Sequence, residues 1–389
     1  MTKVMVDWLR KRGFQVTLAH YMPYSLNKSL SVPLWHLFLG RVKYNCVQSF
    51  GDVPTYEIGC YLPELEWMHY IPNKHWRSLI KEHDFCISVS GSILACLPAV
   101  LMRRKCIAWV ATPYLGDRID RIKKFPLWRK FVDRFFDYPI ASRLERWLLA
   151  KVNVLALSNF TKSELLKLHA TKNIVVMPMA VDSELFNTSK GSLSTKFAEG
   201  GCTEKRIGFA GRFTDPRKNI FFLLDVLEIC RKKNYPVKLE LVGDVPTDEM
   251  VEYIRANGLE DDVIFFGHVD RARLIDHYSN WDLFIIPSKQ EGLAIVGLEA
   301  MACGCPVVST KCGGPEDYIV DGINGALLDF DPNIFSGKII SLLTDNELRI
   351  QMGCNAINTV QEKYTEDIVE LIFWKSFSNQ FLDDSRDLK

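Results

Sequence analysis

The sequence predicts an α/β protein with two domains, each built on a doubly wound parallel β-sheet. Short apolar runs typical of buried strands alternate with helix-like segments along most of the chain. The chain has 389 residues, which is long for a single hydrophobic core. A stretch rich in Ser, Thr and Gly, residues 187–203, separates two such alternating regions and is typical of a linker.

These patterns set the expected domain boundaries. We expect an N-terminal domain over residues 1–190, a linker over 191–204, a C-terminal domain over 205–362 and a closing helical segment over 363–389.

Composition narrows the class of protein. A net charge of +1 gives no general attraction to nucleic acid or acidic partners. The 11 cysteines are odd in number and irregularly spaced, which fits a reduced cytoplasm better than secretion. Cys303, Cys305 and Cys312 have no nearby His or fourth Cys to complete a metal-ligand set, so we expect them to be core residues. We see no signal peptide or membrane-spanning pattern.

The N-terminal domain opens on a helical stripe over residues 1–12, with Gly13 as its stop. A parallel α/β domain normally opens on a central strand and a Gly-rich turn. Loss of a central strand would leave ladder groups unpaired, so we expect that the sequence is shortened at its start. Later strand-like runs lie at residues 14–20, 84–90, 106–111, 152–157 and 173–177.

A basic and aromatic stretch covers residues 118–151, with ten Lys or Arg against four Asp or Glu. This composition suits a face that lies on an anionic membrane surface. It equally suits two core-facing helices with a solvated basic side. Nucleic-acid binding is not expected, because no recognition motif accompanies the charge.

The C-terminal domain shows the clearest alternation of strands and helices. We expect helices around residues 220–232, 294–303 and 366–382. No G-x-G-x-x-G fingerprint follows a strand, which weakens a dehydrogenase interpretation. The expected strands cover residues 205–211, 238–242, 262–266, 283–287 and 306–310.

Two acids mark the candidate site. Glu291 lies at a loop-to-helix junction after the strand 283–287, and Glu299 lies eight positions further on. The carboxyl end of a parallel strand is where open α/β sheets bind ligands, and the helix start at residues 294–296 offers N–H groups to an anion. We therefore expect a ligand with phosphates and hydroxyls. The alternative is that Glu299 is a solvated surface acid and Glu291 an acid of the loop.

An ordered series of motifs over about 160 residues resembles the retaining GT-B glycosyltransferases of family 4, the glycosyl transferases group 1. The pieces are GFAGRF with a following Lys-Asn, KLELVGD, FFGHV, WDLFIIPS, the two glutamates, EAMACGCPVVST and GGPEDYIVDGINGALLD. In the first domain the match is thinner, chiefly SNFTKSELL and MPMAVDSELF.

The resemblance implies a GT-B fold, in which two Rossmann-like domains face a cleft and the final helix returns to the first domain. It implies an enzyme that moves a sugar from a UDP- or GDP-sugar to a glycan or lipid-linked acceptor in surface polysaccharide, lipopolysaccharide or glycolipid synthesis. Anomeric configuration would be retained, with no cofactor and no metal. The donor would bind in the second domain and the acceptor in the first, on a cytoplasmic protein peripheral to the cell membrane.

The resemblance also assigns roles to residues. Glu291 would contact the donor sugar and Glu299 the ribose hydroxyls, while Arg212 and Lys218 would hold the diphosphate. The interval from Arg212 to Lys218 is one residue longer than in the commonest pattern, so Arg217 is an alternative; the adjoining Asn219 favours Lys218. The other expected donor-binding residues are Gly211, Gly267, His268, Val269, Gly292, Leu293, Ala294 and Ile295.

The sequence departs from the pattern of the resembled family at one position, and this departure leaves a non-catalytic function open. Many relatives have a histidine after the strand matched by residues 106–111, and this chain reads WVATPYLGD there. A displacement on one face of the sugar, in which the leaving phosphate takes the acceptor's proton, does not need that histidine. The runner-up hypothesis is a non-catalytic descendant that binds a nucleotide sugar or acts as a scaffold. A weaker one is another GT-B chemistry, such as phosphorolysis or epimerisation.

Overall fold

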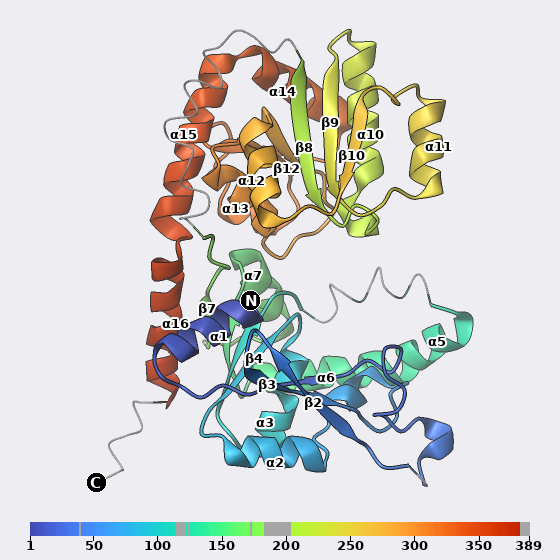
Figure 1. Cartoon of the computed structure of the whole chain (residues 1–389), viewed down its shortest axis with the longest axis vertical. Coiled ribbons are helices and arrows are strands. Elements are labelled where there is room, and N and C mark those ends of the chain that lie inside the picture. The colour runs from blue at the N-terminus through green and yellow to red at the C-terminus, as the bar shows by residue number, and fades with distance from the viewer. Residues whose placement is uncertain are drawn as a thin grey trace. The chain divides into compact units, whose positions relative to one another are not determined.

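The structure is a computed structural model that describes residues 1–38, 40–113, 118, 122, 125–171, 173–182 and 204–381. The chain divides into two compact units (Figure 1). The first comprises Met1–Met177 with Glu370–Lys389, and the second comprises Pro178–Val369. The predicted linker lies outside the described residues except for Glu204, so the predicted boundaries around it stay predictions.

The second unit holds a six-stranded parallel sheet in the order β10-β9-β8-β11-β12-β13. All five strands predicted for this region are present, and β13 joins them at one edge. Strand β11 illustrates why these strands could be predicted. Its four apolar residues are all buried, and a strand covered on both faces is apolar throughout. The strands are β8 (Lys205–Gly211), β9 (Val237–Gly243), β10 (Val263–Gly267), β11 (Leu283–Ile286), β12 (Val307–Thr310) and β13 (Gly325–Leu328).

Helices α11, α12, α14 and α15 of the second unit begin at side-chain caps that the sequence supplies. Thr247, Asp270, Asp331 and Asp345 each accept a hydrogen bond from an N–H of the first helical turn, which satisfies donors that lack a partner within the helix. The helices are α10 (Ile220–Lys232), α11 (Asp248–Ala256), α12 (Arg271–Asn280), α13 (Ile295–Ala302), α14 (Pro332–Thr344) and α15 (Asn346–Lys363), with short 3-10 turns η6 (Pro216–Lys218) and η7 (Gly314–Asp317).

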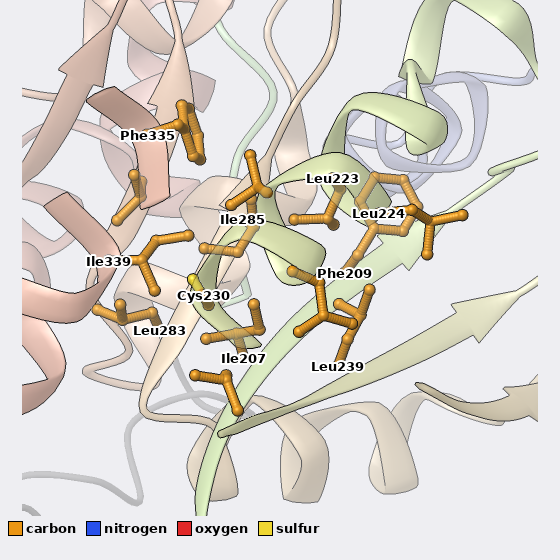
Figure 2. Close-up of a cluster of buried hydrophobic side chains, with 14 of the residues drawn as sticks. Ile207, Phe209, Leu223, Leu224, Cys230, Leu239, Leu283, Ile285, Phe335 and Ile339 are labelled. Atoms are coloured by element: carbon orange, nitrogen blue, oxygen red, sulfur yellow. The ribbon is translucent and has the colours of Figure 1, made fainter. Parts of the chain in front are cut away.

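The core of this unit lies between the sheet and helices α10 and α14. Figure 2 shows side chains of β8, β9 and β11 meeting those of the two helices. Burial of these apolar surfaces is the main force that holds the helices on the sheet. The labelled members are Ile207, Phe209, Leu223, Leu224, Cys230, Leu239, Leu283, Ile285, Phe335 and Ile339.

The described residues of the first unit form two separate sheets. One is three-stranded in the order β1-β3-β2, and the other is parallel and four-stranded in the order β4-β5-β6-β7. The β2–β3 hairpin is antiparallel and was not predicted from the sequence. The strands are β1 (Leu18–Tyr21), β2 (Tyr44–Ser49), β3 (Val53–Ile58), β4 (Cys86–Ser90), β5 (Cys106–Val110), β6 (Asn153–Ala156) and β7 (Ile174–Val176).

Helix α16 (Glu366–Phe381) packs its aromatic side chains within the first unit from Glu370 onward. The Trp374 ring stacks on Phe14 at 6.0 Å, and Phe377 contacts the same ring edge-on at 5.6 Å. The predicted opening helix is present as α1. The helices of this unit are α1 (Thr2–Lys11), α2 (Lys74–Glu82), α3 (Leu97–Leu101), α5 (Leu127–Val132), α6 (Tyr138–Leu149) and α7 (Asn159–Leu168), with short turns η1 (Leu34–His36), η2 (Glu66–Tyr70), η3 (Ile93–Cys96) and the π-helical η4 (Asp133–Asp137).

Strand β8 depends on a glycine at its centre. A Cβ atom on Gly208 would lie 1.9 Å from the indole ring of Trp281, which is fully buried. We expect Gly208→Ala to lower the free energy of unfolding by about 1–3 kcal/mol, because the ring has no space to retreat. The measurement is urea unfolding.

The matched control is Gly337→Ala in the exposed middle of α14, where an added Cβ meets nothing within 4 Å. That change should stabilise the protein by about 0.5–1 kcal/mol through helix propensity. Equal effects of the two substitutions would contradict the packing argument.

Candidate functional site

The candidate site lies at the carboxyl edge of the second unit's sheet, where strands β8 and β11 pair side by side. Their register is Leu283 to Ile207 and Phe284 to Gly208. From β8 the chain winds outward through β9 to β10, and it then returns to place β11 on the other side of β8. Winding therefore reverses between β8 and β11, and such a switch point leaves a crevice between the two outgoing loops.

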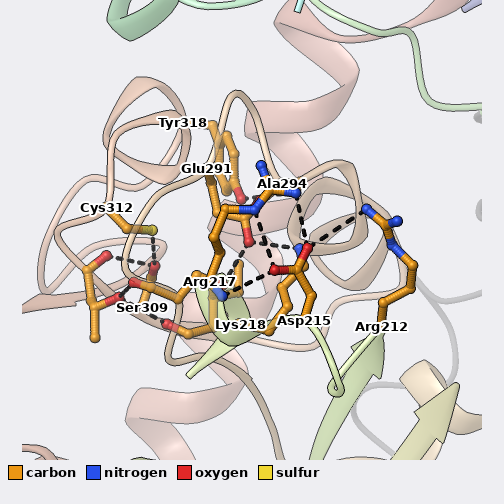
Figure 3. A network of polar contacts seen from close by, with 12 residues as sticks. Arg212, Asp215, Arg217, Lys218, Glu291, Ala294, Ser309, Cys312 and Tyr318 are labelled. Carbon is orange, nitrogen blue, oxygen red and sulfur yellow. Dashed lines mark hydrogen bonds and ion pairs between the residues drawn. The ribbon is translucent and has the colours of Figure 1, made fainter. Parts of the chain in front are cut away.

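An ion pair joins those two loops. The Lys218 ammonium lies 2.7 Å from Glu291 Oε1, and the hydroxyl of Ser288 donates to the same oxygen at 2.5 Å (Figure 3). The side chains of Lys218 and Glu291 are only 19% and 11% exposed. Partial burial reduces solvent screening, so this pair interacts more strongly than a pair on an open surface.

The backbone fixes both partners of the pair. Asn219 takes a left-handed conformation with φ of 52° and ends the turn η6 that carries Lys218. On the other side, the Glu291 N–H donates to the Cys312 carbonyl at 2.7 Å, and Gly314 N–H donates to the Glu291 carbonyl at 2.9 Å. The carboxylate thus stands on a loop that is bonded to the segment after β12.

Two arginines lie beside this pair around Asp215. Arg217 contacts the Asp215 carboxylate at 2.9 Å, while Arg212 lies 3.8 Å from it with 71% of its side chain exposed (Figure 3). Lys218 contacts Glu291, whereas Arg217 is turned to Asp215. Arg212 therefore presents most of its planar donor fork to solvent at the end of β8, a geometry suited to an anion.

The start of α13 is held rigidly. Ala294 precedes the helix in a left-handed conformation with φ of 58°, and the Tyr318 hydroxyl donates to its carbonyl at 3.1 Å. The same hydroxyl would lie 2.3 Å from a Cβ on Gly297, so only glycine fits there. Gly292, Leu293, Ala294 and Ile295 thus lie on a fixed approach to a helix whose first N–H groups favour negative charge.

Glu299 lies further along α13 and has a different partner. The Tyr278 hydroxyl of α12 donates to Glu299 at 3.1 Å. Burial raises the pKa of Glu299, while this hydrogen bond and the nearby charge of Arg271 act in the opposite direction. The two predicted glutamates therefore have separate environments, one paired with a lysine and one half-buried beside a tyrosine.

The remaining predicted residues follow the ends of β8 and β10. Gly211 ends β8 with φ of 143°, and Gly267 ends β10 with φ of 65°. His268 is largely exposed and its Nε2 lies 3.9 Å from Asp244, while Val269 is half-buried. These positions share the carboxyl edge of the parallel sheet with the Lys218–Glu291 pair, since neighbouring parallel strands end at the same edge.

Sequence reasoning missed three contributing residues. Ser288 lies only three positions before Glu291, so its proximity was a usable local signal. Asp215 likewise lies two positions before Arg217. The contact of Tyr278 with Glu299 spans 21 positions and two helices, and no local pattern predicts it.

Among the described residues, there is no group of three or more His, Cys, Asp or Glu that could hold a metal ion. Cys303, Cys305 and Cys312 are buried in the core of the unit. Burial raises the pKa of Cys312 to about 12, so this thiol stays protonated at neutral pH.

None of the described helices is long and apolar enough to cross a bilayer.

Part of the chain matches a family model, and longer segments are similar to known proteins. Residues 196–359 match the family model of the glycosyl transferases group 1. The chain is 26% identical over 287 residues to the capsular polysaccharide biosynthesis glycosyltransferase CapM of Staphylococcus aureus, covering 69% of this chain and 70% of that protein. Other curated relatives are matched over 24% to 48% of their own length.

Solved structures agree on the fold. The structure of HepE from Anabaena in complex with UDP superposes with a TM-score of 0.65 at 19% identity, over 84% of this chain and 87% of that one. WaaG, a glycosyltransferase involved in lipopolysaccharide biosynthesis, gives a TM-score of 0.68 at 14% identity, over 95% and 93%. The chain has the GT-B fold of these proteins, and the predicted fold is confirmed.

The raised pKa of Glu299 predicts a pH-dependent stability. A carboxyl whose pKa is raised by folding contributes stability that is fully present below its unfolded pKa and lost as pH rises through the folded value. We therefore expect Glu299→Gln to gain in melting temperature relative to the parent protein between pH 4 and pH 7, because the amide carries no buried charge. Thermal unfolding at both pH values measures this.

Tyr278→Phe is the opposing variant, because it removes the hydrogen bond that favours the charged carboxylate. Loss of a hydrogen bond to a charged group costs about 1.5–3 kcal/mol. The loss should be larger at pH 7 than at pH 4. A pH-independent difference for Glu299→Gln would contradict the assigned burial.

Proposed function

We propose that the protein is a retaining glycosyltransferase of family 4 that takes its sugar from a UDP- or GDP-sugar, without a bound metal or cofactor. The observation that carries the proposal is the Lys218–Glu291 pair at the sheet's switch point, with Arg212 and the start of α13 beside it. All of these residues lie in the segment that matches the family model.

The acceptor is a glycan or a lipid-linked glycan in surface polysaccharide or glycolipid synthesis. This part of the proposal is supported by the similarity to CapM, whose name places it in capsular polysaccharide biosynthesis. The acceptor binds to the first unit and the donor to the second.

Fixed positive charge supports departure of the nucleotide diphosphate. As the sugar leaves, negative charge grows on the phosphate oxygens, and fixed cations and N–H dipoles stabilise it without having to reorganise. Arg212 offers a planar fork for two phosphate oxygens. Lys218 carries three N–H donors, so it can bond to Glu291 and to a phosphate oxygen at once.

Glu291 contacts the donor sugar in this proposal. Its carboxylate is held by Ser288 and Lys218, so it is oriented before the donor arrives and little rotamer freedom is lost on binding. Glu299 accepts hydrogen bonds from the ribose hydroxyls, which would compensate its burial. Gly211 and residues 292–295 let the backbone approach the diphosphate, and residues 267–269 border the base.

Retention follows from a displacement on one face of the sugar. The bond from the anomeric carbon to the phosphate oxygen breaks, the acceptor oxygen attacks from the same side, and the leaving phosphate takes the acceptor's proton. No side chain acts as a nucleophile in this displacement. It also does not need a histidine at the end of β5, where residues 109–113 read WVATP.

Substitution of the paired residues tests this chemistry. Lys218→Ala and Glu291→Gln should each lower kcat by about 10²–10³-fold, the loss typical of removing one stabilising group from a transition state. Arg212→Ala should lower kcat less, because Arg212 is the more exposed. Lys232→Ala, which removes an exposed lysine paired with Glu228 on α10, is the matched control and should leave turnover unchanged.

Turnover is measured with a panel of UDP- and GDP-sugars, with product anomers assigned by NMR and with EDTA present in one arm. An inverted anomer or loss of activity in EDTA would contradict the proposed mechanism. If the parent protein binds UDP or GDP but neither transfers nor hydrolyses any sugar, the alternative holds. The protein is then a non-catalytic nucleotide-sugar-binding or scaffold protein, as the missing histidine after β5 would suggest.

We also propose that the protein works in the cytoplasm and docks on the inner face of the cell membrane through α5, η4 and α6. Their large apolar side chains point to solvent, and Leu127 is 84% and Trp128 62% exposed. This exposure favours the membrane interpretation of residues 118–151 over the core-facing one. The other exposed aromatics of this face, which we call the α5–α6 face, are Phe131, Phe135, Phe136 and Trp147.

The charges of the α5–α6 face come from fewer residues than the composition suggests. Arg118 and Arg129 form internal ion pairs with Asp133 and Asp137, both of which are buried. Arg134, Arg143 and Arg146 remain exposed among the aromatics. A face that combines exposed aromatic rings with exposed arginines suits the interface of an anionic bilayer.

Removal of the aromatic anchors tests membrane docking. The double variant Trp128→Ser, Phe131→Ser should bind vesicles of phosphatidylglycerol and phosphatidylcholine at least tenfold more weakly at low salt, since each ring loses its burial in the interface. Leu371→Ser, which changes an exposed apolar residue on α16, is the matched control. If the parent protein ignores these vesicles in co-sedimentation, the docking proposal is wrong.

A further inference from the structure

A hollow in the surface of the second unit lies beside the candidate site. It has a volume of about 480 Å³. The start of α10, the loop after β11 and the segment after β13 form its walls. We call it the α10 hollow. Its lining residues are Asn219, Phe221, Phe222, Asp225, Lys289 and Phe330.

Three phenylalanine rings form the apolar part of the α10 hollow. Phe221 and Phe222 are half-buried at the start of α10, while Phe330 is 46% exposed. The Phe222 ring meets Phe330 edge-on with 6.1 Å between the ring centroids, and Phe221 meets Tyr253 edge-on at 5.5 Å. Rings that are already packed in this way lose little conformational freedom when a ligand binds to them.

Polar groups with free bonding capacity surround these rings. Within the part of the chain that the structure describes, the Lys289 ammonium and the side-chain oxygen of Asn219 have no hydrogen-bond or ion-pair partner. Asp225 accepts a hydrogen bond from the Tyr253 hydroxyl through Oδ1, which leaves Oδ2 available. This hydrogen bond raises the pKa of Tyr253 to about 12, so the hydroxyl keeps its proton and orients the carboxylate.

The combination of rings and free polar groups selects an amphipathic ligand. An apolar segment would cover the Lys289 ammonium and the Asp225 carboxylate without hydrogen bonding to them, which is costly. A pyranose ring carries C–H groups on its faces and hydroxyls around its rim. It can therefore contact the phenyl rings and the polar groups at once, as ligands of small-molecule sites commonly do.

We propose that the α10 hollow is a saccharide-binding site that holds an acidic pyranose residue of a glycan. One face of the sugar packs on Phe330, its hydroxyls donate to Asp225 and Asn219, and its carboxylate pairs with Lys289. The hollow does not include Arg212, Lys218 or Glu291, so this site is separate from the proposed donor site. The further statement that the bound residue belongs to the acceptor or product glycan rests on the proposed function.

Short connections link the α10 hollow to the candidate site. The Lys289 N–H donates to the Arg217 carbonyl at 2.7 Å, so the loop after β11 is bonded to the turn η6. Asn219 directly follows Lys218, and Lys289 lies two positions before Glu291, which pairs with Lys218 (Figure 3). A glycan held in the hollow is therefore kept near this ion pair, which raises its effective concentration there.

Calorimetric titration of the full chain with two tetrasaccharides, without any nucleotide sugar, tests the site. One probe is a hyaluronan tetrasaccharide, which carries glucuronate carboxylates, and the other is the neutral N-acetylchitotetraose. We expect both to bind, and the acidic probe about tenfold more tightly, because only its carboxylate forms a charged pair with Lys289. The proposal is wrong if neither probe binds or if the acidic probe binds no more tightly than the neutral one.

Single substitutions locate the bound probe. Phe330→Ala should weaken the binding of both probes about fivefold, because the sugar loses a ring on which it packs. Lys289→Ala should weaken the acidic probe about tenfold and the neutral one by no more than about twofold. Both side chains are exposed, so neither change removes a core contact.

Two matched controls change exposed residues outside the hollow. Ile323→Ala removes an apolar side chain from the loop before β13, and Lys232→Ala removes a lysine at the far end of α10. Both should leave the two affinities unchanged. Equal losses in the controls and in the hollow variants, or no loss in either set, would overturn the assignment to the α10 hollow.

Saturation with UDP separates the α10 hollow from the donor site. We expect the affinity for each probe to be the same with and without UDP, because the two sites share no lining residue among those assigned to them. Competition between UDP and a probe would overturn the proposal. Since no titration involves turnover, binding by a protein that transfers no sugar would refute only the proposed activity. Turnover without probe binding would refute only the saccharide site.

Discussion

The pairing of β8 with β11 is the constraint on which the second unit's site depends. Seventy-six positions separate Leu283 from its partner Ile207, yet the ladder brings the two strand ends to the same edge. The close approach of Trp281 to Gly208 adds a packing contact to the backbone hydrogen bonds. Because these strands are parallel, the loops that follow them leave the sheet at the same edge. Lys218 lies in one of these loops and Glu291 in the other, and the two side chains form an ion pair.

Glu291 and Glu299 differ in the partners of their carboxyl groups. Glu291 has a lysine and a serine as close partners of one carboxyl oxygen. Glu299 has a neutral hydroxyl as its closest partner, and burial raises its pKa. A carboxylate kept in such surroundings reduces stability at neutral pH. Residues retained at a stability cost are typical of binding sites rather than of cores.

The second unit was predictable from its sequence because its signals are local. Strands buried on both faces are continuous apolar runs, and Glu291 and Lys218 lie in the loops that follow two of them. The β2–β3 hairpin was not predicted because most of β2 is exposed, so it has no apolar run. Gly51 in its turn, with φ of 91°, was a usable local signal. Strand β1 begins at Leu18, four residues after the predicted start at residue 14.

Aromatic packing fixes α1 within the first unit. Trp8 of α1 is fully buried, and its ring lies 6.4 Å from that of Trp109 on β5 and 5.9 Å from that of Phe373 on α16. Displacement of α1 would expose these rings, and each large ring buries about 150–250 Å². Burial of aromatic rings therefore holds α1 and α16, which come from opposite ends of the chain, on β5 within one compact unit.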